Sequence, residues 1–192
     1  MTENQIIIEG SGRHIHLDQG ALETLFGKGF ELEVKKQLSQ PGEFASTSRV
    51  DVLGPKGEIK GVSIIGPIRK QTQVELSFTD ARILGINPPI RHSGNLAGSA
   101  PCTLVGPAGR VDLKEGAIVA KRHVHCTPED AARMNVVDRE VVQVVVNGER
   151  GLIFDEVVCR VGPKYATCMH IDYDEVNAAA LFGEMTGIVR KK

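Results

Sequence analysis

The sequence predicts a mostly β protein built as two similar halves. The first observation is a tract that occurs twice, with a β-branched residue between two histidines: Arg13-His14-Ile15-His16-Leu17 and Arg122-His123-Val124-His125-Cys126. The second is that short runs of Val, Ile and Leu alternate with Gly-Pro pairs, at residues 54–55, 66–67, 106–107 and 162–163. Short apolar runs bounded by tight turns are typical of β-sheets with close connections.

Composition and charge exclude several classes of protein. A chain of 192 residues that is 41% apolar and 24% charged is ordinary for one large or two small globular domains. A net charge of −1 and the absence of Trp argue against binding of nucleic acid. The apolar runs are too short to span a membrane, and the start lacks a signal-peptide pattern, so we expect a cytoplasmic protein.

The first half is expected to alternate strands with two short helical segments. Asp18 is a good N-cap for a helix that includes Ala21 to Phe26 and ends at Gly27. A helical turn is expected at 80–84, and the polar, Gly-rich residues 90–101 are interpreted as a functional loop. The remaining periodicity predicts strands at 5–8, 30–38 (half-buried), 48–53, 58–65, 72–78, 102–106 and 110–113.

The second half repeats this order from about Ala117. A strand over 117–125 carries its histidine pair, and Thr127-Pro128 begins a helix as N-cap and first helical residue. Strands are predicted at 141–146 and 152–161 around an Asn147-Gly148 turn, and at 165–171. Asp174 is expected to cap a last helix, and the basic tail to be a solvated end.

The halves can be aligned beyond the histidine tracts. Residues 73–82 and 168–177 occupy corresponding places, which sets Glu75 opposite His170. The corresponding domains are 1–100 and 101–192, and the sequence leaves open whether strands are exchanged between them. The intervening lengths differ, but loop insertions of this size are tolerated in a repeat.

Each half therefore supplies an H-x-H pair and a third ligand-type residue. Alternate residues of a strand share a face roughly 6.6 Å apart, so the two imidazoles of a pair can meet on one ion. Three N/O ligands with an open position are typical of catalytic zinc, although cobalt, nickel or iron(II) suit the same donors. The candidate metal ligands are His14, His16 and Glu75 in one half and His123, His125 and His170 in the other.

Simpler explanations exist for each of these residues. A single H-x-H is often a pair of surface histidines, and Glu75 alone would be a solvated strand carboxylate. The cysteines at 102, 126, 159 and 168 contain no C-x-x-C pair, and we interpret them as free, buried, small apolar residues. Arg69 and Ser93 form a second candidate group, because a guanidinium and a loop hydroxyl suit a phosphate or oxyanion. The simpler explanation is a surface arginine and a turn serine.

Several motifs together resemble one family. They are Ser11-x-Arg13-His14-Ile15-His16-Leu17, Gly66-Pro67-x-Arg69, Thr72-Gln73-Val74-Glu75, Arg91-x-Ser93-Gly94, Lys121-Arg122-His123-Val124-His125 and His170-Ile171-Asp172-x-Asp174-Glu175-x-Asn177. Over about residues 5–189 the chain is similar to the PduL-type phosphate acyltransferases, or phosphate propanoyltransferases, which are associated with bacterial microcompartments. Each motif alone is weak, whereas the set is highly specific.

The resemblance implies a fold and a site. It implies two β-barrel domains capped by short helices, with two zinc ions at their junction held by the six ligands named above. It implies phosphate contacts from Arg69 and Ser93, both as catalytic residues, and coenzyme A contacts from Ser11, Lys36 and Asn177. Microcompartment members often carry an extra N-terminal segment for encapsulation, and few residues here precede the first strand. Association with shell or lumen proteins and homo-oligomerisation are left open.

The implied reaction is reversible conversion of an acyl-CoA and phosphate to an acyl phosphate and CoA. Propanoyl and acetyl groups both suit it. Phosphate oriented by Arg69 and Ser93 would attack the thioester carbonyl directly, because no Ser-His-Asp or Cys-His nucleophile is evident in the sequence. The alternatives are a zinc-dependent thioester hydrolase, in which hydroxide replaces phosphate, and a non-catalytic metal-binding domain.

Overall fold

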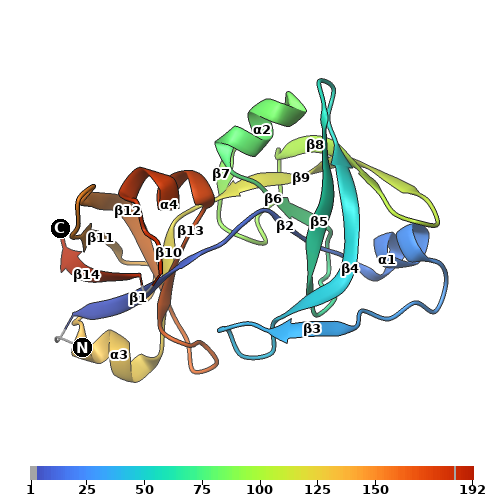
Figure 1. The fold of residues 1–192 in the computed structure, drawn as a ribbon. Coiled ribbons are helices and arrows are strands. Elements are labelled where there is room, and N and C mark those ends of the chain that lie inside the picture. Colours follow the sequence, from blue (N-terminus) through green and yellow to red (C-terminus); the bar gives the residue numbers. More distant parts are fainter. Residues whose placement is uncertain (1–3, 184) are drawn as a thin grey trace. The chain divides into compact units, whose positions relative to one another are not determined.

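The computed structural model describes residues 4–183 and 185–192, and the chain divides into two compact units (Figure 1). We call Gly12–Ala120 the first barrel, and Lys121–Lys192 together with the N-terminal strand the second barrel. Both are mostly β with short helices, as the sequence predicts. None of the described helices is both long and apolar enough to cross a bilayer.

The first barrel closes through six described strands. In spatial order they are β4 (Phe44–Leu53), β5 (Glu58–Gly66), β2 (His14–His16), β6 (Gln73–Glu75), β9 (Arg110–Ala120) and β8 (Ala100–Val105), and β8 pairs back onto β4. Two further strands extend this sheet: β3 (Val34–Gln37) beside β4 and β7 (Ile90–Arg91) beside β9. The helices are α1 (Gln19–Phe26) and α2 (Phe78–Leu84).

The second barrel has an equivalent closed ring. Its order is β1 (Gln5–Gly10), β13 (Cys168–Ile171), β10 (His123–Cys126), β12 (Leu152–Val161), β11 (Val141–Val146) and β14 (Thr186–Lys191). The helices are α3 (Pro128–Arg133) and α4 (Tyr173–Ala179). In both rings the histidine strand lies between a parallel neighbour, β5 or β12, and an antiparallel one, β6 or β13.

The two rings exchange one strand each. Strand β1 precedes the histidine strand β2 in the chain, yet it pairs with β13 and β14 of the second barrel. Strand β9 precedes the other histidine strand, β10, yet it pairs with β6 and β8 of the first. In Figure 1 the blue β1 accordingly lies with the red strands of the second barrel. The second barrel is thus completed by β1, which leads into the histidine pair of the first. The first barrel is completed by β9, which leads into the histidine pair of the second.

This exchange moves the limits of the compact units away from residue 100, where sequence alone placed them. The units divide the chain after Ser11 and after Ala120. The physical reason is pairing, because β8 binds β4 and β9, and β9 binds β6. Residues 100–120 therefore complete the first ring rather than begin the second.

The central residue of each H-x-H packs inside its barrel. Ile15 and Val124 are fully buried and belong to the two separate apolar cores. The histidines on either side of them face the opposite side of the strand, as strand alternation requires. The four cysteines are free and buried, as predicted, and Cys126 lies in the second core with Val124.

Several predicted elements differ in extent. Strand β3 covers only Val34–Gln37 and is exposed rather than half-buried, while Phe30 and Leu32 pack on the core from a loop. The strand predicted over 117–125 is two strands, β9 and β10, which belong to different rings. The basic tail is not a free end, because β14 pairs with β1 and β11 and buries Val189. The sequence hides this alternation, because Ile188 is an exposed apolar residue and only charged residues follow Val189.

Side-chain caps begin the helices. Asp18, Ser77 and Thr127 cap α1, α2 and α3 by accepting a hydrogen bond from a backbone N–H. The last helix is capped by Asp172 rather than by Asp174. Ser77 and Asp172 both form capping boxes, with Asp80 and Glu175 as the third helical residues. These two caps correspond in the sequence alignment of the halves.

Each of the two Gly-Pro-x-Gly turns forms a hydrogen bond with the C-terminal part of a helix. The backbone N–H of Lys56 donates to the Leu84 carbonyl at the end of α2, and that of Ala108 to the Leu25 carbonyl near the end of α1, each at 3.0 Å. A Cβ on Gly106 would lie 2.5 Å from the Leu25 carbonyl oxygen. Only glycine allows this close approach, so the turn and the helix satisfy each other's backbone groups.

Gly106→Ala is expected to destabilise the protein, because the added methyl group must displace the backbone of α1. The expected loss is roughly 1–3 kcal/mol in the free energy of unfolding, measured by denaturant titration. Gly20→Ala is the matched control, since its Cβ would make only an ordinary contact, 3.4 Å from Asp18. That helical substitution should be neutral or stabilise by about 0.5–1 kcal/mol. Equal midpoints for the two variants would contradict the packing argument.

Candidate functional site

Strand register brings three ligand-type residues together in each barrel. His14 lies directly opposite Glu75 in the antiparallel β2–β6 pair, and His123 lies directly opposite His170 in β10–β13. Opposed residues of an antiparallel pair project on the same face. The third residue therefore joins the face that already carries the two histidines. Glu75 and His170 thus occupy equivalent positions, as the alignment of the halves predicts.

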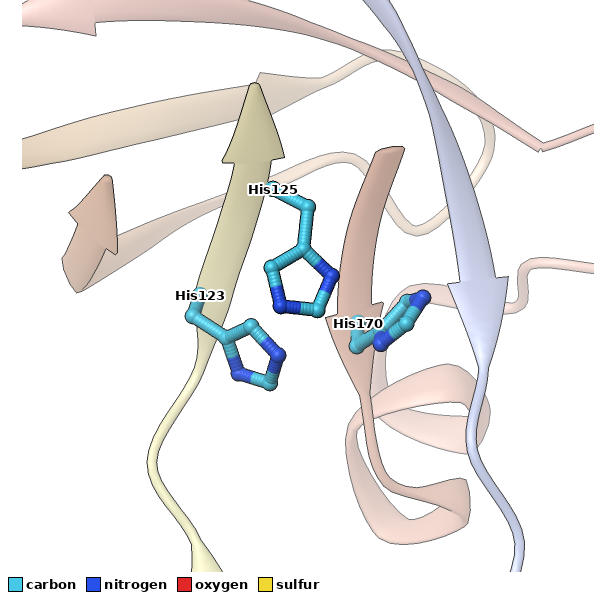
Figure 2. Close-up of side chains that lie close together, drawn as sticks. All are labelled: His123, His125 and His170. Atoms are coloured by element: carbon cyan, nitrogen blue, oxygen red, sulfur yellow. The ribbon is translucent and has the colours of Figure 1, made fainter. Parts of the chain in front are cut away.

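The candidate ligand atoms are close in both sets. Within each set one donor atom per residue lies within 4.8 Å of the others. In the second barrel the ring centres of His123, His125 and His170 are 4.7–5.3 Å apart. Figure 2 shows the three rings converging from two neighbouring strands. In the first barrel the His14 and His16 rings are 4.9 Å apart, and the His14 Nε2 atom is 3.6 Å from the Glu75 Oε2 atom.

Backbone carbonyls orient the first histidine of each pair. The Nδ1 atom of His14 is 2.8 Å from the Gly12 carbonyl oxygen, and that of His123 is 2.9 Å from the Lys121 carbonyl oxygen. A carbonyl only accepts, so Nδ1 carries the hydrogen and the Nε2 lone pair faces the set. A metal-binding histidine is usually oriented by such a bond at its other nitrogen.

The second histidine of each pair is held neutral. Burial, followed by the nearby His14 and Arg69, lowers the pKa of His16 well below its usual value. Burial, with His123, His170 and Arg160 nearby, lowers the pKa of His125 to about 2. Neutral imidazole is the form that binds metal. The His125 Nδ1 atom is also buried without a hydrogen-bond partner among the described residues. These donors fit a divalent metal.

His170 has a different environment. Its Nε2 atom lies 3.1 Å from the Cys168 sulfur and 3.4 Å from a Glu9 carboxylate oxygen. Burial lowers the pKa of His170, but the hydrogen bonds to Cys168 and Glu9 outweigh it and raise the pKa to about 10. Cys168 is therefore not merely a small apolar residue, as the sequence suggested, because its thiol contacts a candidate ligand. Glu9, Cys168 and His170 also lie close enough to share an ion.

The arginine before each histidine pair has a structural partner. Arg13 forms an ion pair with Asp80 at 3.1 Å, and Arg122 forms one with Glu175. Both acids are the third residues of the capping boxes of α2 and α4. The repeated arginine thus ties the histidine strand to the helix that follows the third ligand. This shared ion pair accounts for the arginine that precedes both histidine pairs in the sequence.

The first barrel brings the candidate anion-binding residues beside its ligand set. An Arg69 Nη1 hydrogen donates to the Ser93 hydroxyl oxygen at 3.1 Å, and Nη2 pairs with Glu43 at 2.9 Å. Gln73 Nε2 donates to both Ser93 and Glu75, at 2.8 and 2.5 Å. A chain of hydrogen bonds therefore links the Arg69 guanidinium to a candidate metal ligand.

The three candidate CoA-binding residues belong to different units. Ser11 and Asn177 lie in the second barrel, where the Ser11 N–H donates to the Ile171 carbonyl just before α4, which carries Asn177. Lys36 is exposed on β3 of the first barrel. The bond at Ser11 is made by its backbone, which leaves the role of its side chain as a prediction.

Sequence reasoning missed several residues of these groups. Gln73 and Glu43 contact Ser93 and Arg69, the candidate anion-binding residues. Glu9 contacts His170 from the exchanged strand β1. In the second barrel Tyr165 stacks on His125, with ring centres 4.3 Å apart. A glutamine two residues before Glu75, on the same face of a strand, is a signal that strand alternation offers. Glu9 gave no such signal, because its contact depends on the strand exchange.

Comparison with known proteins identifies the family of the chain. Residues 7–182 match the family model described as phosphate propanoyltransferase. The chain is 49% identical over 192 residues to a phosphate propanoyltransferase of Listeria monocytogenes, covering all of this chain and 90% of that protein. It is 50% identical over 189 residues to one of Enterococcus faecalis and 48% identical over 189 residues to one of Thermotoga maritima. Those alignments cover 98% and 97% of this chain and 90% of each relative.

A match over nearly the whole chain includes both ligand sets and the Arg69–Ser93 group. On these grounds the chain belongs to the phosphate propanoyltransferase family of acyltransferases.

Proposed function

We propose that this protein is a metal-dependent phosphate acyltransferase that converts an acyl-CoA and phosphate to an acyl phosphate and CoA, reversibly. The observation that carries the proposal is the hydrogen-bonded chain from Arg69 through Ser93 and Gln73 to Glu75. It joins a candidate phosphate site to a candidate metal site within one barrel. Family membership supports propanoyl-CoA as the acyl donor, with acetyl-CoA as a second candidate.

Two zinc ions are proposed as cofactors, one per barrel. His14, His16 and Glu75 would hold one, and His123, His125 and His170 the other. The metals would supply Lewis-acid polarisation and charge stabilisation. Imidazoles and a carboxylate suit zinc, and other divalent ions fit the same donors.

The chain's own residues orient the nucleophile. Arg69 offers a planar cation with hydrogen-bond donors that match phosphate oxygens, and Ser93 offers a hydroxyl beside it. A phosphate oxygen would attack the thioester carbonyl carbon, so that a C–O bond forms, the C–S bond breaks and CoA leaves as the thiolate. Holding both reactants in this geometry supplies much of the rate enhancement. Ser11, Lys36 and Asn177 are proposed contacts for CoA.

Two competing functions make different predictions. A thioester hydrolase with the same metal ligands would release CoA without phosphate, and a metal-binding domain would release none. The Arg69–Ser93 group favours phosphate as nucleophile, since hydrolysis has no need of an anion site. Microcompartment association rests on the family resemblance alone, and co-purification of the full-length protein with shells tests it.

The first prediction from this function concerns metal content. Wild-type protein should hold two zinc ions per chain after dialysis, measured by elemental analysis. His14→Ala and His123→Ala should each lower this to about one, because each removes a ligand from a different barrel. His92→Ala is the control, since His92 lies outside both ligand sets. Full zinc occupancy in either ligand variant would contradict the assignment.

The second prediction concerns Arg69. Arg69→Ala should lower kcat/KM for phosphate by about 10²–10³, because a charged donor to the nucleophile is lost, while zinc content stays unchanged. The assay traps propanoyl phosphate with hydroxylamine. Arg110→Ala, an exposed arginine of the same barrel, should have no effect. Loss of zinc from Arg69→Ala would instead indicate a structural role.

The third prediction concerns the Cys168–His170 contact, which resembles a nucleophile–base pair. Cys168 is 3% exposed, so we expect direct transfer rather than an acylated cysteine. Labelled CoA should not exchange into propanoyl-CoA when phosphate is absent, and Cys168→Ala should retain acyl transfer. Phosphate-independent exchange that Cys168→Ala abolishes would establish a covalent acyl-enzyme.

A further inference from the structure

Gln73 is a buried amide at the centre of the proposed phosphate site. Its side chain is 1% exposed and lies on β6, two residues from Glu75. A buried amide is costly unless its polar atoms are paired. The hydrogen bonds of the Gln73 amide therefore determine whether neighbouring groups act as donors or acceptors.

The orientation of the Gln73 amide is fixed by its neighbours. The Gly94 backbone N–H can only donate, and it lies 2.7 Å from Oε1, so that atom is the oxygen. The amide nitrogen donates one hydrogen to Glu75 Oε1 at 2.5 Å and the other to the Ser93 hydroxyl at 2.8 Å. Both N–H groups are therefore used, and the amide cannot flip without placing its oxygen against a carboxylate.

Ser93 becomes a hydrogen-bond donor as a result. Its oxygen accepts one bond from Arg69 and one from Gln73, which occupies both of its lone pairs. The hydroxyl hydrogen must then point in the remaining direction, away from both donors. Such a hydroxyl can donate to a phosphate oxygen. It has no lone pair left to accept a hydrogen bond from an attacking water molecule.

Glu75 is constrained by the same amide. Its Oε1 atom accepts from Gln73, whereas Oε2 lies 3.6 Å from the Nε2 atom of His14. The two oxygens therefore have separate roles, with Oε2 directed at the ligand set. One amide thus orients a candidate metal ligand and a candidate phosphate ligand together.

We propose that Gln73 is a positioning residue that selects phosphate over water as the nucleophile. It acts through Ser93, which it holds as a donor to an oxyanion, and through Glu75, whose Oε1 atom it fixes by a hydrogen bond. This inference rests on the proposed phosphate acyltransferase activity and deepens it. Arg69 supplies the charge of the site, and Gln73 sets the direction of its hydrogen bonds.

The test measures binding of inorganic phosphate to zinc-loaded protein by calorimetry, with no acyl-CoA present. Gln73→Met keeps the volume and removes the donors, and should weaken phosphate binding about tenfold. Gln73→Glu keeps the shape but places an acceptor where Ser93 needs a donor, so the hydroxyl should turn inward. That variant should lose more affinity than Gln73→Met, on the order of a hundredfold. If Gln73 only fills space, Gln73→Glu should bind phosphate more tightly than Gln73→Met, because it keeps the shape better. That result would overturn the proposal.

A double-mutant cycle tests whether Gln73 acts through Ser93. Ser93→Ala alone should weaken phosphate binding about tenfold, and adding Gln73→Met should cost little more. Fully additive effects would overturn this step. The ratio of phosphate-independent to phosphate-dependent CoA release should also rise in Gln73→Met, and an unchanged ratio would overturn the claim of selectivity.

Two controls separate the explanations. Zinc content identifies variants that lose metal, and circular dichroism identifies variants that unfold. If Gln73→Met does not fold, Ser93→Ala tests the donor role by itself, because Ser93 is only half-buried. Undiminished phosphate affinity in Ser93→Ala would then overturn the proposal. If wild-type protein binds no phosphate and forms no acyl phosphate, the proposed function itself fails. If wild-type protein does both and Gln73→Met behaves identically, only the inference about Gln73 fails.

Discussion

The rest of the structure depends on one constraint, the antiparallel pairing of each histidine strand with its neighbour. The pairs are β2 with β6 and β10 with β13. The registers that set His14 opposite Glu75 and His123 opposite His170 place three candidate ligand residues on one face of each barrel. A shift of one residue would turn the third ligand to the opposite face of its strand. The buried Ile15 and Val124 oppose such a shift, because it would exchange a core residue for an imidazole. The apolar core and the ligand set are therefore specified by the same alternation.

Duplication explains why so many details occur twice. Both barrels repeat the strand order, the carbonyl that orients the first histidine, the capping box and the arginine that binds its acid. The two barrels differ in the residues that surround the candidate ligands. Gln73 and Glu75 in the first barrel correspond to Cys168 and His170 in the second, so an amide–carboxylate pair is replaced by a thiol–imidazole pair. The Arg69–Ser93 group adjoins the first pair, which gives that barrel the hydrogen-bond donors an oxyanion needs.

The sequence predicts which candidate ligands lie together in each barrel, because strand alternation is local and the duplication supplies a second copy against which to align. That these residues bind metal stays a prediction. The sequence predicts the caps at Asp18 and Thr127 for the same local reason. Long-range pairing is where it fails. Nothing local indicates that β1 and β9 are exchanged, that the basic tail forms β14, or that Glu9 reaches His170. The hydrogen bonds of Gln73 are also beyond sequence reasoning, because a polar residue in a strand acquires such partners only when Gly94 and Ser93 approach it from a distant loop.

The most direct test of the account is release of CoA thiol from propanoyl-CoA by the purified protein, with and without phosphate, before and after treatment with a chelator. If the proposed sites act together, release requires both phosphate and metal and returns when zinc is restored. Release that is equally fast without phosphate would contradict the account and identify a hydrolase. Phosphate-dependent release that survives complete removal of metal would contradict the assignment of the two histidine sets.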